Sequence, residues 1–115
     1  MLIIGGGPAG FTAALYAARA DLGTLVMTPA ELSGMMARAP MVENFPGQVE
    51  PAPGREILAK IRQQALNAGA DESLEDAVGV DFSGDELTVY GGGGVHEARA
   101  VIIATGSMAR GEKIP

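Results

Sequence analysis

Three glycines spaced as Gly5-x-Gly7-x-x-Gly10 constrain the fold of this chain more than any other feature of its sequence. They follow the apolar residues 1–4 and open an alanine-rich segment that begins with Pro8. This order predicts a buried strand, a tight turn and a helix with proline in its first turn. In such a turn the first glycine permits the bend, the second lets a pyrophosphate approach the backbone, and the third lets helix and strand pack closely. The pattern therefore predicts a dinucleotide-binding turn, with a glycine turn that binds no ligand as the alternative.

A second strand is expected directly after this helix. The alanine-rich segment 8–20 favours a helix, and the apolar segment 24–28 indicates a buried strand. Strand, turn, helix and strand in this order form a βαβ unit with a right-handed crossover. A dinucleotide-binding unit of this kind carries a carboxylate near the end of its second strand for the ribose hydroxyls. The nearest one here is Glu31, so we expect it to bind the adenosine ribose, with a solvated loop carboxylate as the alternative.

The rest of the chain indicates an α/β fold with one antiparallel addition to a parallel sheet. Residues 29–54 hold five of the seven prolines and show no lasting period, which indicates a long functional loop. Apolar side chains at helical spacing predict a helix over 55–68. Short alternating runs predict an antiparallel meander over 77–98, and the apolar segment 100–104 predicts another buried parallel strand. We expect one domain over all 115 residues.

The composition excludes several classes of protein. The net charge of −6 does not suit a nucleic-acid binder, which needs a basic face to follow phosphates. The absence of cysteine excludes a disulfide framework and a thiolate metal site. The apolar stretches are too short to span a bilayer, and no basic segment precedes the first of them. We therefore expect no membrane anchor, no signal peptide and a cytoplasmic location.

No residue pattern indicates catalysis or metal binding by this chain itself. There is no Ser/His/Asp arrangement, and the single histidine, His96, is expected at the surface of a strand. Candidate metal ligands do not cluster in the sequence, and the methionines have no regular spacing. We therefore predict cofactor-binding residues but no catalytic residue and no metal site.

Three motifs, taken together, are similar to those of a known family. The segments GGGPAGFTAALYAARA (5–20), VENFPG (42–47) and ATGSMAR (104–110) resemble parts of the bacterial low-molecular-weight thioredoxin reductases. Those enzymes are flavoproteins of the pyridine nucleotide-disulfide oxidoreductase superfamily, and the resemblance runs over the whole chain. It implies a Rossmann-like FAD-binding domain, here incomplete, with a parallel sheet and a small β-meander.

The resemblance also implies which residues hold FAD. The glycine turn would hold the pyrophosphate, and Thr28 and Glu31 would lie beside the adenosine. Asn44 would hydrogen-bond the ribityl-flavin end, and the turn at 105–106 would lie over the dinucleotide, although a plain turn and a strand end are the structural alternatives. The predicted cofactor-binding residues are Gly5, Gly7, Pro8, Ala9, Gly10, Thr28, Glu31, Gly34, Met35, Asn44, Thr105 and Gly106.

The chain departs from the family pattern around the expected flavin end. Residues 33–36 read Ser-Gly-Met-Met where Gly-Gly-Gln-Leu is usual, so an amide expected near the flavin ring is missing. Met35 cannot replace the hydrogen bonds of that amide. Residues 38–40 read Arg-Ala-Pro where a run of threonine is usual. Two alternatives therefore stay open: a flavoprotein of the same fold with another electron donor or acceptor, and a non-catalytic module that binds no flavin.

The resemblance further implies partners that this chain does not contain. In the family, electrons pass from NADPH to FAD, then to a Cys-x-x-Cys disulfide and to thioredoxin. The NADPH-binding domain, with that disulfide, and a returning segment follow a position like Pro115. We therefore expect a fragment that does not bind NADPH, completed by the rest of its polypeptide or by a second chain, and a homodimer in the complete enzyme. Without the returning segment, one face of the sheet should stay partly uncovered and expose apolar surface.

Overall fold

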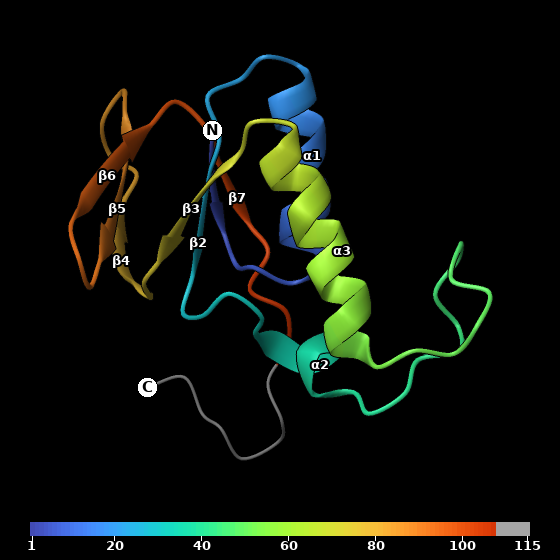
Figure 1. Ribbon diagram of the computed structural model, residues 1–115. Helices are drawn as coiled ribbons and strands as arrows, with labels where there is room; N and C mark the ends of the chain where they lie inside the picture. Colours follow the sequence, from blue (N-terminus) through green and yellow to red (C-terminus); the bar gives the residue numbers. More distant parts are fainter. Residues whose placement is uncertain (108–115) are drawn as a thin grey trace.

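A parallel sheet forms the centre of the protein. The computed structural model describes residues 1–107, and Figure 1 shows the arrangement of their helices and strands. The parallel strands lie in the order β3, β2, β1 and β7, which span Asp71–Leu74, Leu25–Thr28, Leu2–Ile4 and Val101–Ile103. In this register Ile3 lies between Val26 and Ile102. The apolar runs that predicted buried strands therefore meet side by side in the middle of the molecule.

Two helices cover one face of this sheet. Helix α1 spans Pro8–Arg19, and helix α3 spans Gly54–Asn67. Both turn an apolar stripe toward the strands, so Phe11, Leu58 and Ala65 have no exposed surface. A short helix, α2 (Gly34–Arg38), lies beside the amino-terminal end of α3 (Figure 1). The predicted βαβ unit and the second long helix are confirmed, with ends that differ by about one residue, as helix ends commonly do.

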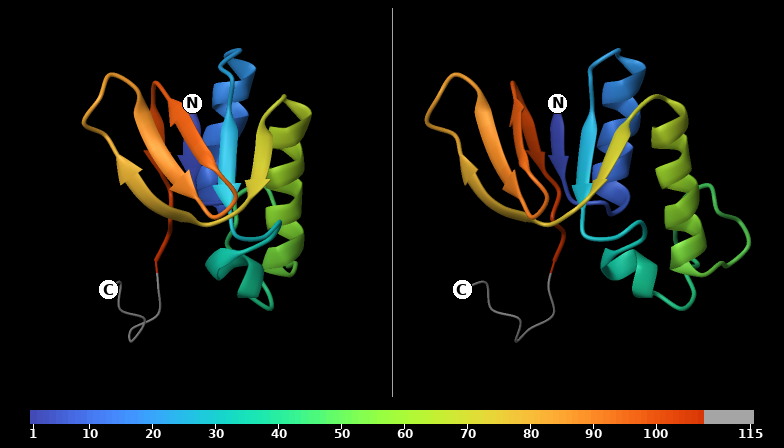
Figure 2. Two further views of the ribbon diagram at one scale, coloured as in Figure 1. Left: turned by 90° about the vertical axis from the view of Figure 1, so that its left-hand side faces the viewer. Right: turned by 60° about the vertical axis from the view of Figure 1, so that its left-hand side comes forward.

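An antiparallel meander covers the other face. Its strands β4 (Ala77–Asp81), β5 (Leu87–Gly91) and β6 (Val95–Ala98) pair in that order. Figure 2 shows the meander on one side of the parallel strands and the long helices on the other. Val89 of β5 is fully buried and packs in one cluster with Leu2 and Met27 of the parallel sheet. The fold is thus an α/β, Rossmann-like arrangement with a small meander, as predicted.

The expectation of a partly uncovered sheet face needs correction. Leu2 and Met27 point toward the meander and are no more than 2% exposed, so the central strands are buried on both faces. Large apolar side chains of this sheet are exposed at both of its edges, where Ile103 of β7 is 65% and Leu74 of β3 is 55% exposed. The predicted meander covers the face of the central strands that was expected to be partly uncovered. In the part of the chain that the structure describes, no helix has the length and apolar character to cross a membrane.

Two secondary-structure elements, strand β3 and helix α2, were not predicted from the sequence. Strand β3 reads Asp-Glu-Ser-Leu and has no fully buried side chain, because it is an edge strand whose place is set by its backbone pairing with β2. Arg62 of α3 also holds this strand, since its guanidinium donates to the carboxylate of Glu72 at 2.5 to 3.1 Å. Helix α2 is five residues long, too short to show a period, and lies inside the predicted loop 29–54.

Candidate functional site

A pocket of about 620 Å³ opens at the carboxyl ends of the parallel strands. Small-molecule sites commonly measure about 300 to 1,000 Å³. The chain builds the sheet outward from β1 to β2 and β3, and then crosses to the other side of β1 to form β7. The strand order therefore reverses between β1 and β7. Ligands of open α/β sheets bind at such a reversal, beyond the carboxyl ends of the strands.

The turn between β1 and α1 forms the floor of the pocket. Gly5 has a φ of +114° and donates its N–H to the carbonyl of Met27 at 2.8 Å. Gly10 packs its backbone on the carbonyl of Gly5, so closely that a Cβ there would overlap the oxygen. Gly7 differs from both, because a Cβ on it would meet nothing within 4 Å. Gly5 and Gly10 are thus required by protein packing, whereas the space above Gly7 is open.

The start of helix α1 supplies hydrogen-bond donors at this floor. Its first backbone hydrogen bond runs from the N–H of Phe11 to the carbonyl of Gly7 at 3.0 Å, and no side chain caps the helix. The N–H groups of the preceding turn therefore have no partner within the helix, and they carry a partial positive charge. Such a terminus binds a phosphate without lysine or arginine.

Thr28 holds the wall that follows β2. Its side chain is buried, and its hydroxyl donates to the carbonyl of Ala30 at 3.0 Å and lies 3.1 Å from the hydroxyl of Ser33. The backbone of Gly6 packs directly against the Thr28 side chain. Ser33 lines the pocket and Thr28 does not. Thr28 therefore holds the pocket wall in place without lining the pocket itself.

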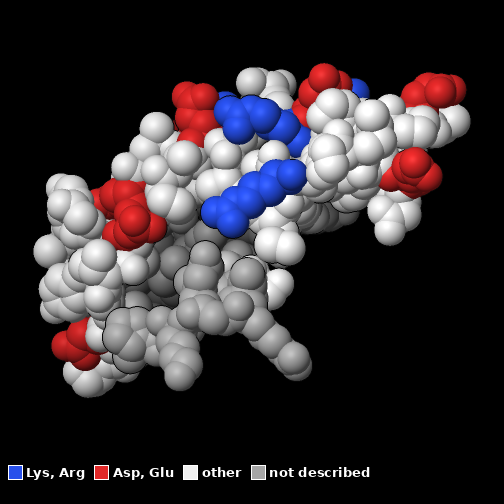
Figure 3. Space-filling model, turned by 90° about the horizontal axis from the view of Figure 1, so that it is seen from below, with Lys and Arg blue, Asp and Glu red and all other residues white. Residues whose placement is uncertain are grey.

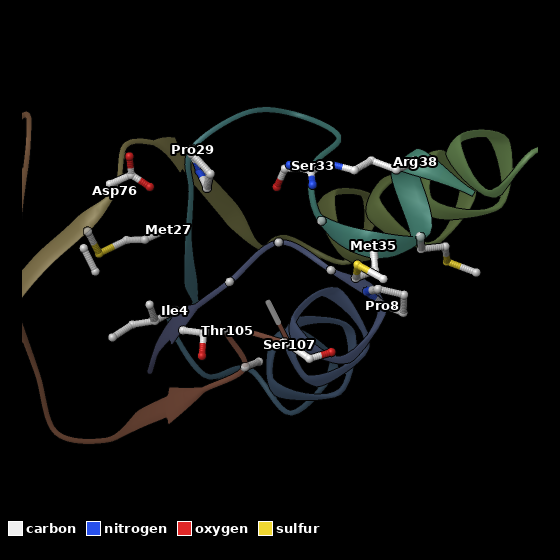
Figure 4. A pocket seen from close by; sticks show the side chains of 18 of the residues that line it. Ile4, Pro8, Met27, Pro29, Ser33, Met35, Arg38, Asp76, Thr105 and Ser107 are labelled. Atoms are coloured by element: carbon white, nitrogen blue, oxygen red, sulfur yellow. The ribbon is translucent and has the colours of Figure 1, made fainter. Parts of the chain in front are cut away.

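Charged side chains of opposite sign line the two ends of the pocket. Figure 4 shows Arg38 and Met35 at one end, Asp76 and Met27 at the other, and Ser33 between them. Figure 3 looks onto this edge of the molecule and shows basic side chains near its middle and acidic ones toward its rim. A ligand spanning the pocket would meet a cation at the α2 end and carboxylates at the β3 end.

Glu75 ties the end of β3 to the glycine-rich turn of the meander. Its carboxylate accepts hydrogen bonds from the N–H of Gly93 at 2.7 Å and the hydroxyl of Ser73 at 2.8 Å, and it also pairs with the Nε2 of His96. These contacts hold the pKa of Glu75 below its ordinary value, with the Gly93 N–H as the largest cause. His96 was expected at the surface, but its side chain is only 26% exposed because it packs on Glu75.

The pocket brings together part of the predicted cofactor-binding set. The predicted residues that line it are Gly5, Gly7, Pro8, Gly34, Met35, Thr105 and Gly106. Ala9, Gly10, Thr28, Glu31 and Asn44 do not line it. The side chain of Glu31 is 65% exposed and its Oε1 lies 3.8 Å from Nη2 of Arg62. Asn44 lies exposed in the loop between α2 and α3.

The pocket is also lined by Glu75 and Asp76, which connect β3 to β4, and by Ala77, the first residue of β4; none of the three was predicted from the sequence. The carboxyl ends of parallel strands share one edge, so this segment could have been found if β3 had been recognised. Arg38 was noted as a departure from the family pattern, without a position in the pocket. Among residues 1–107, no group of three or more metal-ligating side chains lies together.

Comparisons with known proteins agree with this architecture. The profile of the pyridine nucleotide-disulphide oxidoreductases matches residues 1–115. A thioredoxin reductase from Mycolicibacterium smegmatis is 44% identical over 115 residues, covering 100% of this chain and 37% of that protein. A solved thioredoxin reductase from Gloeobacter violaceus has a TM-score of 0.92 and 36% identity, with 99% of this chain and 36% of that chain covered.

A relative with a different activity also matches. A glucosaminate ammonia-lyase from Pseudomonas fluorescens is 34% identical over 110 residues, covering 96% of this chain and 34% of that protein. The chain thus spans about a third of the length of the curated relatives it matches.

Proposed function

The chain belongs to the pyridine nucleotide-disulphide oxidoreductase family, and from this we propose that residues 1–115 form the N-terminal portion of an FAD-binding domain. The complete protein would be a thioredoxin reductase-like flavoprotein, a proposal supported by the relatives of that name. The observation that carries the FAD proposal is the open space above Gly7 in a turn where Gly5 and Gly10 are tightly packed. A pyrophosphate needs such an approach to the backbone, and packing inside the protein gives no other reason for glycine at this position.

The backbone donors at the pocket floor support the binding of a dinucleotide. The glycine turn and the first turn of α1, with Pro8 and Ala9, would hold the pyrophosphate through backbone N–H groups. Gly34, Met35, Thr105 and Gly106 also line the pocket. By the family resemblance, Gly34 and Met35 would lie near the flavin end, and the turn at 105–106 would lie over the dinucleotide. The family resemblance adds Asn44 to the flavin end and Thr28 to the adenosine end. It assigns Glu31 to the adenosine end as well, but Glu31 does not line the pocket and its side chain is 65% exposed, which does not support that role.

FAD bound here would supply hydride and electron transfer, and the residues of this chain would bind and orient it. The buried strands beneath the pocket and the two methionines of α2 would keep water from its floor. The chain contains no cysteine, so the disulfide that accepts electrons would lie outside these 115 residues, as would the NADPH site. We place the complete enzyme in the cytoplasm as a homodimer, with this domain completed by the rest of the polypeptide or by a second chain.

A second candidate is a flavoprotein of the same fold with another electron donor or acceptor. Met35 and Arg38 line the pocket, and both differ from the residues usual in the family. The similarity to an ammonia-lyase supports this candidate as well, because it links a related sequence to another activity. Reduction of the bound flavin by NADPH, followed in a stopped-flow spectrometer with the complete protein, separates the two candidates.

The test of FAD binding is a visible absorption spectrum. The purified protein is mixed with FAD, the excess is removed by gel filtration, and the spectrum is recorded. We expect a retained flavin spectrum, and a ratio of flavin to protein that falls in a Gly7→Ala variant. A folded wild-type protein that stays colourless would contradict the proposal.

A further inference from the structure

We propose that Asp76 supplies the carboxylate on which the adenosine end of the dinucleotide depends, in place of Glu31. This inference rests on the proposed FAD binding and names a specificity-determining residue for it. The sequence pattern led to Glu31 because that residue follows β2. The structure instead puts Asp76, which follows β3, on the pocket wall.

The topology brings Asp76 to the same edge as the end of β2. Strands β2 and β3 are parallel neighbours, and Thr28 pairs with Leu74 at their carboxyl ends. Pro29 and Asp76 therefore leave the sheet side by side, and both line the pocket (Figure 4). Asp76 reaches the pocket only because β3 exists, which explains why the sequence pattern did not indicate it.

The way in which a dinucleotide would lie in the pocket assigns Asp76 to its adenosine end. The glycine turn at the centre would take the pyrophosphate, and a carboxylate there would repel it. Asp76 lies away from that centre, on the β2 and β3 side, where dinucleotide-binding folds place the carboxylate for the ribose. The ribose hydroxyls and the adenine amino group are donors, and an ionised carboxylate only accepts.

Asp76 is held in place by its backbone while its carboxylate is free. Its carbonyl accepts a hydrogen bond from the N–H of Gly92 at 3.2 Å. Within residues 1–107, no hydrogen bond or ion pair engages the Asp76 carboxylate. The adjacent carboxylate of Glu75 is already occupied by Gly93, Ser73 and His96. Of the two acidic side chains at this end, Asp76 is therefore the acceptor available to a ligand.

Glu31 is placed less well for this role. Its side chain is 65% exposed and it does not line the pocket. Its Oε1 lies 3.8 Å from the guanidinium of Arg62, which also binds Glu72. In the same loop, Ser33 lines the pocket and its hydroxyl lies 3.1 Å from that of Thr28, which packs on Gly6 of the glycine turn.

The experiment compares Asp76→Ala with Glu31→Ala and uses two ligands, FAD and ADP. Dissociation constants are measured by flavin fluorescence quenching and by isothermal titration calorimetry. ADP carries the adenosine and the pyrophosphate but no flavin. We expect Asp76→Ala to weaken the binding of FAD and of ADP by the same factor, about tenfold for one charge-assisted hydrogen bond. Glu31→Ala should change either dissociation constant by less than about twofold.

Three outcomes would overturn the proposal. The first is a loss of affinity in Glu31→Ala with none in Asp76→Ala. The second is a loss for FAD without a loss for ADP in Asp76→Ala, which would move Asp76 to the flavin end. The third is a wild-type protein that binds neither ligand, in which case the proposed FAD binding fails too. Both alanine variants must keep the wild-type melting temperature, and Asp76→Asn, which keeps an acceptor oxygen, should recover part of the affinity.

Discussion

Two glycine-rich turns stand at opposite ends of the chain and are built on different physical grounds. In the first, Gly5 has a positive φ, and neither Gly5 nor Gly10 has room for a Cβ, because backbone atoms occupy that space. In the turn at residues 91–94 no glycine has a positive φ, and a Cβ on Gly92 would meet nothing within 4 Å. The first turn needs Gly5 and Gly10 for its packing, and the second is held by a carboxylate.

This difference shows that a run of glycines does not by itself indicate a ligand. In the first turn the glycines let three pieces of backbone approach one another, and one glycine faces open space where a ligand fits. In the second, Glu75 binds the N–H of Gly93, and its carboxylate occupies the space beside Gly91. Substitutions in the two turns should therefore differ widely in effect.

Gly10→Ala should have the largest effect on stability. Its Cβ would overlap the carbonyl oxygen of Gly5, and a backbone atom cannot move aside without displacing the turn. We expect a loss of about 3 kcal/mol in the free energy of unfolding, measured by urea denaturation. Thr12→Ala, on the exposed side of the same helix, is the control and should change it by less than ~0.5 kcal/mol. Equal stabilities for the two variants would show that the turn is not tightly packed.

Gly7→Ala should separate binding from folding. The added methyl meets no protein atom, but Gly7 is the N-cap of α1, where alanine is less favoured than glycine, so the melting temperature should fall by much less than in Gly10→Ala. It would stand where the pyrophosphate approaches, and we expect FAD to bind at least about tenfold more weakly, roughly 1.4 kcal/mol. Fluorescence titration and thermal unfolding are done on the same sample. Unchanged FAD affinity would mean that this turn does not hold the pyrophosphate.

Glu75→Gln should weaken the second turn in a pH-dependent way. The pKa of Glu75 is lowered in the folded protein, so its ionised form stabilises the fold above the ordinary pKa of a glutamate. That contribution is lost as the pH falls through the lowered pKa. We expect Glu75→Gln to lower the melting temperature at pH 7, by less than Gly10→Ala does, and to approach the wild type as the pH falls through the lowered pKa.

The control for this variant is Glu97→Gln, an exposed glutamate on the same strand as His96. Its melting temperature should follow that of the wild type at every pH. If the difference between Glu75→Gln and the wild type did not shrink in acid, the charge of Glu75 would not be the cause of its effect.

Gly92→Ala should have the smallest effect. The position has room for a methyl and a backbone conformation that alanine can adopt. The substitution restricts the unfolded chain, so stability should stay within ~0.5 kcal/mol of the wild type or rise slightly. Urea denaturation measures this, and a loss comparable with that of Gly10→Ala would remove the contrast between the two turns.

The fold could be predicted wherever one short segment carried enough apolar residues. The run Leu2–Ile4, the glycines after it and the amphipathic helices were recognised because burial and packing leave a periodic pattern in the sequence. Strand β3 left no such pattern, since it is a polar edge strand that exists through its hydrogen bonds to β2. The same difference explains why only part of the pocket was predicted. The glycines that form its floor are close together in the sequence, whereas Asp76 reaches the pocket because β3 pairs with β2.

The amino-acid pattern alone was enough for the βαβ unit, the glycine turn and the resemblance to a flavoprotein family, because each depends on residues close together along the chain. Tertiary packing decided which carboxylate faces the pocket, how Glu75 and His96 hold the meander, and that the meander buries the second face of the sheet. These features join residues far apart in sequence, and no local propensity encodes such contacts. The positions of these residues follow from the order of the strands in the sheet, and that order forms only when the whole chain folds.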